Sequence, residues 1–271
     1  MRHRMKRSTV DSAKHNYEIV EQQKQRASRS MSRMFLFWVS QVLGILLSVL
    51  TLTWIFKHKN GFTWSSDPKR QFSWHPTFMV IGMVYLFSHG IVIFRIFPEM
   101  KKWTLKLIHM GINLTAGAMG GFALYAVIDE RNTAGKDHFQ SLHSWIGVGA
   151  LGLFAVQWVG GVLLFLIPCS PKSLRSRAIS WHILIGGAIF ILSVIAAVTG
   201  IKNSAGKGDT EEKTLLNVLG IFLIISLLFH LYVLAKASYR HPSSPPTSRP
   251  PFNVRTLDPE AVPLKFWEDS D

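Results

Sequence analysis

Six long stretches without Asp, Glu, Lys or Arg constrain the fold of this chain more than any other feature of its sequence. They cover approximately residues 34–56, 71–94, 107–128, 141–168, 178–201 and 214–235. A helix that crosses a bilayer requires about 20 consecutive, mainly apolar residues, and each stretch reaches that length. Residues 1–33 are polar throughout and lack the pattern of a cleavable signal peptide. The sequence therefore predicts an all-α integral membrane protein with six retained transmembrane helices.

Lys and Arg are distributed unevenly among the segments that join these stretches. If residues 1–33 lie in the cytoplasm, the cytoplasmic segments hold 21 of the 30 basic residues and the external segments hold 9. With 9 of the 16 acidic residues also inside, the net charge is +12 on the cytoplasmic side and +2 outside. Cytoplasmic segments of membrane proteins carry an excess of Lys and Arg. The distribution therefore predicts that both termini are cytoplasmic.

The overall charge and the single cysteine exclude other classes of protein. The formal net charge is +14, yet 48% of the residues are hydrophobic and stand in long uncharged blocks. A soluble nucleic-acid-binding protein has a more evenly mixed sequence, so we expect a lipid bilayer and no nucleic acid as partner. The one cysteine, Cys169, permits neither an intrachain disulfide nor a cysteine-held iron–sulfur cluster. Any cofactor must therefore be bound by other groups.

Two polar tails flank the membrane domain. Residues 1–33 are basic and rich in Ser and Gln, whereas residues 236–271 are rich in Pro and end in an acidic cluster. Both have too few apolar residues to form a core, so both are predicted to be flexible and cytoplasmic. The six-helix domain then covers residues 34–235, with its core at 71–201. Neither tail distinguishes the plasma membrane from an endosomal, lysosomal or vesicle membrane.

Four histidines lie near the starts of the second to fifth stretches: His75, His109, His143 and His182. Because successive membrane helices run in opposite directions, His75 and His143 meet near the external face, and His109 and His182 near the cytoplasmic face. Ionisable residues within a span are costly and require a partner. The pattern predicts a central four-helix bundle, made of spans two to five, that offers two axial ligands to each of two metal centres.

The ligand inventory favours haem at these centres. A zinc or non-haem iron site needs further nitrogen, sulfur or carboxylate ligands near each pair, and the six stretches contain no carboxylate. A porphyrin supplies four nitrogens itself, and histidine on both of its faces leaves no position for oxygen. We interpret the pattern as two bis-histidine b haems that transfer single electrons. Asn113, one turn after His109, is a candidate for contact with a haem edge or propionate, or for packing.

The roles of two further histidines are not settled by the sequence, and two other functions compete with electron transfer. His89 lies 14 residues after His75, about 21 Å along an α-helix and about 40° around it; it has no evident partner and is interpreted as a core residue or one that supports a ligand. His230 is likewise unpaired. The competing functions are a proton-coupled transporter with a histidine relay and a non-catalytic membrane scaffold. The first expects carboxylates or broken helices in the spans, and the second leaves the paired histidines unexplained.

Four short motifs resemble those of the cytochrome b561 family, the ascorbate-dependent di-haem transmembrane electron carriers that include duodenal-type ferric reductases. The motifs are Trp74-His75-Pro76, the Lys-x-x-His-x-x-x-Asn segment from Lys106 to Asn113, Ser141-Leu142-His143-Ser144-Trp145, and Ser173-Leu174-Arg175-Ser176-Arg177 before His182. The resemblance covers residues 72–201 approximately. The four axial ligands that it implies are those selected above by depth, in the same pairs, and it also implies a homodimer.

The resemblance implies an oxidoreductase of the ferric or monodehydroascorbate reductase type. Electrons would pass from cytoplasmic ascorbate through the two haems to monodehydroascorbate or Fe(III) on the external or lumenal side. A basic cytoplasmic rim suits ascorbate, a monoanion, because charge-assisted hydrogen bonds to its oxygens favour binding. The candidate ascorbate residues are Lys101, Lys102, Lys106, Arg175 and Arg177. The same residues also serve as positive-inside anchors.

The chain departs from the family pattern on the external side. Gln140 stands where the family usually has Tyr, and residues 128–132 read Ile-Asp-Glu-Arg-Asn where it often has a histidine. His138 is the expected substitute in the acceptor site, and Arg131 is expected to attract an anion. Arg131, His138 and Gln140 are therefore the candidate external substrate residues, while the identity of the acceptor does not follow from the sequence.

Overall fold

The computed structural model describes residues 2–64, 67–167, 170–206 and 208–236, with side chains from residue 15 onward. Its elements are α1 (Arg2–His58), α2 (Pro68–Gln71), α3 (Trp74–Phe78), η1 (Met79–Leu86), α4 (Phe87–Ile96), α5 (Lys102–Thr133), α6 (Leu142–Gly161), η2 (Val162–Leu166), α7 (Lys172–Ala205) and α8 (Thr210–Ala235). The described residues form helices and connecting turns, without a strand. Cys169 and residues 237–271 of the predicted C-terminal tail lie outside the described residues.

Six helical runs are long and apolar enough to cross a membrane. They are α1, the run from α2 through α4, α5, α6 with η2, α7 and α8. Each contains most or all of one of the six uncharged stretches. The predicted all-α membrane fold with six spans is therefore confirmed.

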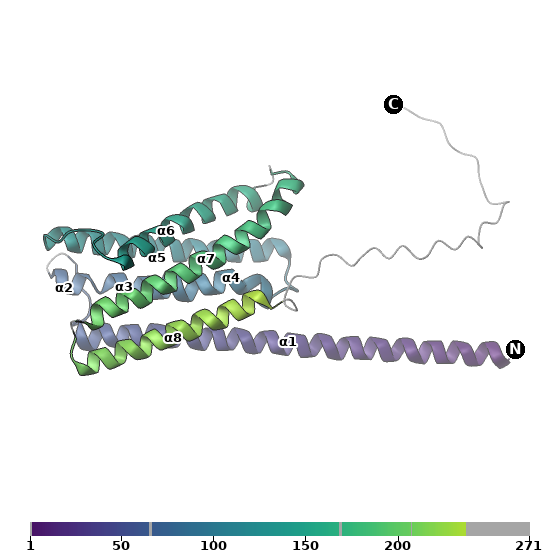
Figure 1. Ribbon diagram of the computed structural model, residues 1–271. Helices are drawn as coiled ribbons and strands as arrows, with labels where there is room; N and C mark the ends of the chain where they lie inside the picture. Colours follow the sequence, from purple (N-terminus) through teal and green to yellow (C-terminus); the bar gives the residue numbers. More distant parts are fainter. Residues whose placement is uncertain (1, 65–66, 168–169, 207, 237–271) are drawn as a thin grey trace, which may run out of the picture. The chain divides into compact units, whose positions relative to one another are not determined.

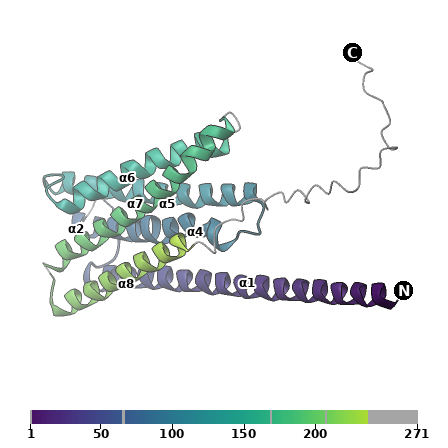
Figure 2. The ribbon, with the colours of Figure 1, turned by 45° about the vertical axis from the view of Figure 1, so that its right-hand side comes forward.

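The helices pack in neighbouring pairs (Figures 1 and 2). α1 and α8 lie side by side, α6 packs along α7, and α5 packs along the second span, which consists of α3, η1 and α4. α7 also contacts α8 and η1, so it connects the outer pair of spans to the others. In the middle of the bundle, the ring of Phe87 meets those of Phe154 and Phe190 at 5.0 and 5.9 Å. This aromatic core comes from spans two, four and five.

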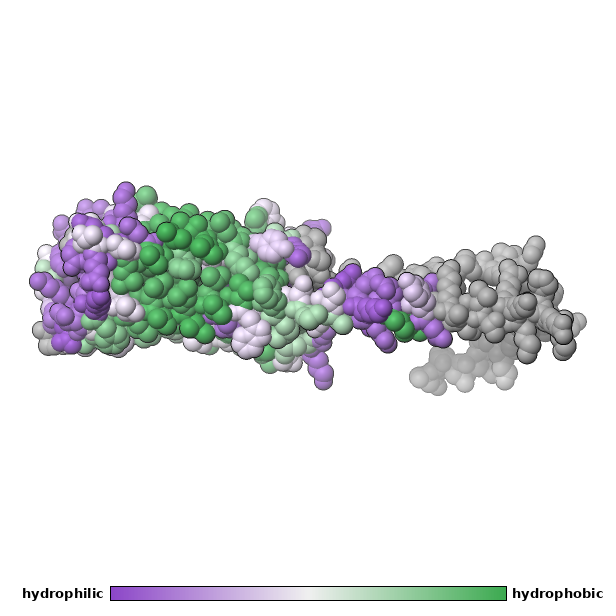
Figure 3. All heavy atoms as spheres, turned by 90° about the horizontal axis from the view of Figure 1, so that it is seen from below, coloured by the Kyte–Doolittle hydropathy of each residue, from purple (hydrophilic) through white to green (hydrophobic). Residues whose placement is uncertain are grey.

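The surface of the bundle is apolar around its middle. Figure 3 shows hydrophobic residues over the middle of the face that carries α1 and α8, with hydrophilic residues at its end and along the part of α1 beyond the bundle. The exposed side chains there include Val42, Ile45 and Val49 of α1 and Ile221 of α8. A contiguous apolar surface of this kind is unfavourable in water, and the band is the surface that lipid covers.

The N-terminal segment, which the sequence predicts to be a flexible tail, is helical, and its flexibility stays a prediction. Residues 2–33 continue α1 as one helix beyond the bundle (Figure 1). The segment contains neither Gly nor Pro, and extending an existing helix by one residue costs far less than nucleating a new one. The side chains of residues 15–32 are almost all exposed, so the segment contributes no core, as its composition indicates.

A π-helical segment interrupts the second span between its two histidines. η1 occupies Met79–Leu86, after His75 and before His89. A π-helix closes its hydrogen bonds at i→i+5 and therefore turns less per residue than an α-helix. The segment shifts the direction in which His89 points relative to His75, so the angle of about 40° expected for a continuous α-helix does not apply.

Candidate functional site: two histidine pairs

The first pair joins His75 of α3 and His143 in the first turn of α6. Their ring centroids lie 5.9 Å apart, with an interplanar angle of 88°. His75 Nδ1 donates to the carbonyl oxygen of Ala123 on α5 at 3.2 Å, and His143 Nδ1 donates to that of Ala196 on α7 at 2.7 Å. Because a carbonyl only accepts, each Nδ1 carries the ring proton and each Nε2 keeps a lone pair for a metal.

The second pair joins His109 of α5 and His182 of α7. Their ring centroids lie 6.1 Å apart, with an interplanar angle of 60°. His109 Nδ1 donates to the carbonyl oxygen of Gly90 on α4 at 2.7 Å. The ring proton is therefore on Nδ1, and Nε2 keeps a lone pair for a metal. The backbone of His182 is held differently, since its carbonyl accepts from Gln157 Nε2 of α6 at 2.5 Å.

The separation within each pair suits one metal ion between two rings. A first-row metal sits about 2 Å from an imidazole nitrogen, which is about 1 Å from its ring centre, so two axial imidazoles have centroids about 6 Å apart. The observed values are 5.9 and 6.1 Å. In the described residues neither pair is joined into a cluster of three or more His, Cys, Asp or Glu. Two imidazole donors alone suit a group that brings its own equatorial ligands, as a porphyrin does.

Two helical glycines make room for the ligand rings. A Cβ atom built on Gly200 of α7 would lie 2.8 Å from Cε1 of His143, and one on Gly161 of α6 would lie 3.1 Å from Cε1 of His182. Both distances are shorter than ordinary carbon–carbon contacts. Sequence reasoning did not single out Gly200, or Gly90 as the acceptor for His109, because only the packed helices show which backbone faces a histidine.

Asn113 lies directly beside the ligand His109. Its side-chain Nδ2 donates to the carbonyl oxygen of His109 at 2.7 Å, and the side chain packs against Gly90. Asn113 is buried, with 5% of its surface exposed. It therefore braces the helix turn that carries His109. The predicted contact with a haem edge stays a prediction.

The five predicted ascorbate residues lie at the end of the bundle that holds His109 and His182. Lys106 Nζ donates to the carbonyl oxygen of Phe165 at 2.8 Å, and the Phe165 ring packs 5.2 Å from that of His182. The structure thus brings Lys106 next to the second pair. Lys101, Lys102 and Arg177 are exposed and Arg175 is half-buried, at the first turns of α5 and α7.

The predicted acceptor residues lie at the opposite end: Arg131 in the last turn of α5, and His138 and Gln140 on the connection to α6. Arg131 Nε donates to the carbonyl oxygen of Asp137 at 2.7 Å. His138 Nε2 lies 2.8 Å from Asn132 Oδ1, and Gln140 is exposed. Both side chains therefore bond across the junction between the end of α5 and the connection that follows it.

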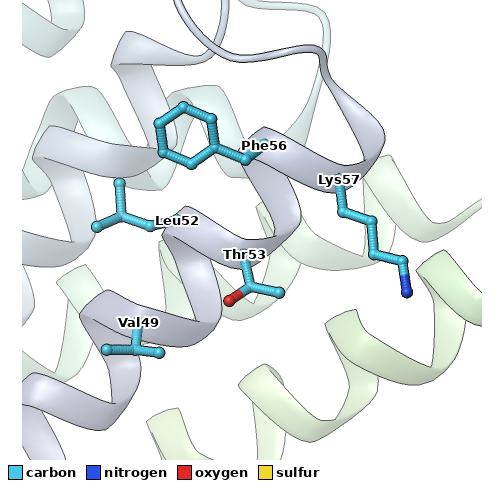
Figure 4. A pocket seen from close by; sticks show the side chains of 5 residues that line it. All are labelled: Val49, Leu52, Thr53, Phe56 and Lys57. Carbon is cyan, nitrogen blue, oxygen red and sulfur yellow. The ribbon is translucent and has the colours of Figure 1, made fainter.

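A surface hollow on α1 is not part of either pair. Figure 4 shows its lining, which is Val49, Leu52, Thr53, Phe56 and Lys57. Val49 and Phe56 are exposed on the apolar face of the bundle. The hollow offers no imidazole and no acidic group, so it lacks the donors that a metal centre requires.

The sequence showed no partner for His89 or His230, and this interpretation was wrong, because both rings contact the same serine. Their Nε2 atoms lie 3.1 and 2.7 Å from the hydroxyl oxygen of Ser40 on α1. The ring centroids are 6.0 Å apart. The cause is the π-helical segment η1, since an uninterrupted α-helix would direct His89 elsewhere.

A six-span helical bundle with one histidine pair toward each end has the architecture of a membrane-embedded b-type cytochrome. Residues 74–206, which contain both pairs, match the family model described as eukaryotic cytochrome b561. The chain belongs to the cytochrome b561 family, and the resemblance carried by its four motifs is confirmed.

Curated relatives match most of the chain. It is 36% identical to the "Transmembrane ascorbate-dependent reductase CYB561" of Homo sapiens over 225 residues, which is 80% of this chain and 89% of that protein. It is 32% identical to the "Lysosomal membrane ascorbate-dependent ferrireductase CYB561A3" of Danio rerio, covering 74% and 87% of the two chains. It is 30% identical to the "Probable ascorbate-specific transmembrane electron transporter 2" of Oryza sativa subsp. japonica, covering 77% and 91%.

Proposed function

We propose that this protein is an ascorbate-dependent transmembrane oxidoreductase. It takes single electrons from ascorbate at the His109–His182 end of the bundle and delivers them to an acceptor at the His75–His143 end. The observation that carries this proposal is one histidine pair toward each end of the bundle, with ring centroids 5.9 and 6.1 Å apart. The His89–His230 pair, at 6.0 Å, differs because the Ser40 hydroxyl contacts both of its Nε2 atoms. The relatives named as ascorbate-dependent reductases support the choice of donor.

Each histidine pair is proposed to hold one b haem, which when bound would supply a one-electron carrier. The chain contributes the orientation of the ligands. The carbonyl oxygens of Ala123, Ala196 and Gly90 fix the tautomer of three ligand rings, and such hydrogen bonds raise the basicity of a metal-bound imidazole. The aromatic core of Phe87, Phe154 and Phe190 fills the space between the two ends and keeps water out of the middle of the bundle.

The proposed donor site is the basic rim at the His109–His182 end. Ascorbate is a monoanion at neutral pH, and the rim offers Lys101, Lys102, Lys106, Arg175 and Arg177. Lys106 is the residue with the most direct placement, because it bonds the carbonyl of Phe165, whose ring packs on His182. If the excess of +12 over +2 in net charge sets the orientation, this rim is cytoplasmic.

The proposed acceptor carries negative charge, as monodehydroascorbate or a chelate of Fe(III) does. Arg131, in the last turn of α5, lies at the His75–His143 end together with Lys136 and His138 of the following connection. Two acidic groups at this end have side-chain partners: Asp129 accepts from Gln71 Nε2 at 2.6 Å, and Glu130 pairs with Lys136 at 2.5 Å. Arg131, whose guanidinium donates to the backbone carbonyl of Asp137, is the positive group proposed to attract the acceptor. The homodimer implied by the family resemblance stays a prediction.

Electron transfer across a sealed membrane tests the proposal. The protein is reconstituted into liposomes that enclose ascorbate, and reduction of an external ferric chelate or of monodehydroascorbate is followed by absorbance. We expect acceptor reduction that depends on protein, and that stops in His109→Ala. An equal rate in liposomes without protein, or with the variant, would refute transmembrane transfer. The ratio of rates with the two acceptors identifies the preferred one.

A further inference from the structure

Three residues from three spans form a buried polar cluster outside the two histidine pairs. Ser40 of α1, His89 of α4 and His230 of α8 have 0%, 8% and 1% of their surfaces exposed. Ser40 Oγ lies 3.1 Å from His89 Nε2 and 2.7 Å from His230 Nε2. We call these residues the Ser40 triad. None of them has a role in the function proposed above.

The second nitrogen of each ring has a fixed protonation state. His89 Nδ1 donates to the carbonyl oxygen of Tyr85 at 2.8 Å, and His230 Nδ1 donates to that of Ser226 at 2.7 Å. A carbonyl has no hydrogen to give, so each Nδ1 must carry one. If both rings are neutral, both Nε2 atoms facing Ser40 are acceptors.

With both rings neutral, the triad has one hydrogen fewer than its two Nε2 acceptors require. The Ser40 hydroxyl has a single hydrogen and can satisfy one of the two Nε2 acceptors. The shorter contact, 2.7 Å, is the one to His230, which leaves His89 Nε2 facing the serine oxygen at 3.1 Å without a hydrogen between them. One added proton on His89 Nε2 completes the chain, because His89 then donates to Ser40 and Ser40 donates to His230. An unsatisfied buried acceptor is costly, but a lone buried charge is costlier. The proton is therefore favoured only when an added electron nearby offsets its charge.

The surroundings of the triad hold few other titratable or charged groups. Tyr85 of η1 packs its ring 4.9 Å from that of His89 and donates its hydroxyl to Gln41 at 2.7 Å. Ser88 and Ser226 lie beside the two rings. From α7, the Phe190 ring packs 5.8 Å from His230.

The charged residues near the triad along the chain are Arg33, Arg95 and Lys236. Arg95 follows His89 by six residues and Lys236 follows His230 by six, about 9 Å along each helix. The charged residue of α1 on this side is Arg33, about 10 Å before Ser40 along the helix, and it is paired with Glu99. α5 approaches through Gly90, where it presents Asn113 and His109.

The triad is connected to the second histidine pair through one residue. Gly90, whose carbonyl oxygen holds His109 Nδ1 at 2.7 Å, directly follows His89 in α4. A positive charge on the triad favours an added electron at the centre beside it, and by linkage an electron there favours the proton. Such linkages between sites are typically 5- to 150-fold in affinity, by order of magnitude.

We propose that Ser40, His89 and His230 form a buried site for a single proton, and that this proton is taken up when the His109–His182 centre is reduced. The linkage rests on the proposed function, whereas the proton site itself does not. The proton comes from the aqueous phase and binds the lone pair of His89 Nε2, so one N–H bond forms and no covalent bond between heavier atoms changes.

Nitrogen-15 NMR of the full chain, labelled at histidine, reduced and held in lipid nanodiscs, tests the proton site. Signals are assigned by comparison with His89→Gln and His230→Gln. We expect one ring of the triad to be cationic, with both nitrogens protonated, and the other neutral between pH 6 and pH 7. Two neutral rings throughout that range would overturn the proposal. The NMR measurement of ring protonation requires no substrate. If the cationic ring is observed in a protein that does not oxidise ascorbate, the proposed function is rejected and the proton site is retained.

The midpoint potential of the His109–His182 centre tests the linkage. In the wild type we expect the midpoint to fall as pH rises from 6 to 8, because the proton is lost. His230→Gln and Ser40→Ala are expected to abolish this fall while retaining the haem signals. The matched control is Ser48→Ala, since Ser48 lies on the same helix and donates only to the Gly44 carbonyl at 2.8 Å. A pH-dependent fall of equal size in the wild type and in His230→Gln would reject the linkage.

Discussion

Replacing Gly200 by alanine is expected to weaken the His75–His143 centre without changing either ligand. The new Cβ would lie 2.8 Å from Cε1 of His143 and 2.9 Å from its Nδ1. An ordinary contact is about 3.5 Å, so the ring must retreat by about 0.7 Å. The ring is not free to do so, because its Nδ1 donates to Ala196 one turn earlier on the same helix at 2.7 Å. The retreat breaks that hydrogen bond and misdirects Nε2.

The size of the effect follows from the role of such hydrogen bonds in metal sites. Disturbing the partner that orients a metal-bound histidine lowers metal affinity by roughly 10- to 100-fold. The assay is the haem content of purified protein, read from the absorbance of the reduced form, together with titration of added haem. We expect Gly200→Ala to lose one of two haems, or to bind one of them 10- to 100-fold more weakly.

A control separates this effect from a general change in helix stability. Alanine is favoured over glycine in a helix interior by about 1 kcal/mol, so replacing a helical glycine by alanine does not by itself weaken helix formation. Gly220 of α8 has no atom within 4 Å of the added Cβ, and Gly220→Ala should bind both haems normally. Wild-type haem content and affinity in Gly200→Ala would refute the argument from steric contact.

Four further outcomes are expected. Gly161→Ala should disturb the His109–His182 centre less than Gly200→Ala does the other, because its Cβ would lie 3.1 Å from the His182 ring; haem titration compares the two. His89→Ala should retain both haems, and loss of either would make it a ligand. Lys106→Ala should raise KM for ascorbate up to about tenfold with little change in kcat, and Lys106→Arg should restore it in steady-state assays. Asp209 caps α8 by accepting from the backbone of Glu212 at 2.7 Å, and this hydrogen bond lowers the pKa of its carboxyl below 3.8. The stabilisation is present above pH 3.8 and is lost as pH falls through the lowered pKa, so Asp209→Ala should lower the thermal midpoint at pH 6 and have less effect at pH 3.

The membrane fold and the histidine pairs could be predicted from the sequence because each rests on a strong, local pattern. A run of about 20 uncharged residues has one stable form in lipid. Antiparallel neighbours then place residues at the starts of alternate spans at one depth. His75 with His143 and His109 with His182 meet in the structure as this reasoning predicts.

The sequence could not predict features that depend on helix rotation and backbone contact. The π-helical η1 redirects His89 toward Ser40 and His230. The residue types in Met79–Leu86 do not indicate a change from an α-helix to a π-helix. The carbonyl acceptors Ala123 and Ala196 are chemically like any other backbone group, so only packing selects them. The partner of Arg131 is likewise a backbone group, the carbonyl oxygen of Asp137.

The haem-to-protein ratio in two single variants tests the central claim most directly. The claim is that each histidine pair holds one of two b haems. The account predicts two haems per chain in the wild type, both with b-type absorbance after reduction. It predicts that His143→Ala and His109→Ala each lose one haem, and that the two losses remove different spectral and potentiometric components. Two haems retained in both variants, or loss of the same component in both, would contradict the assignment.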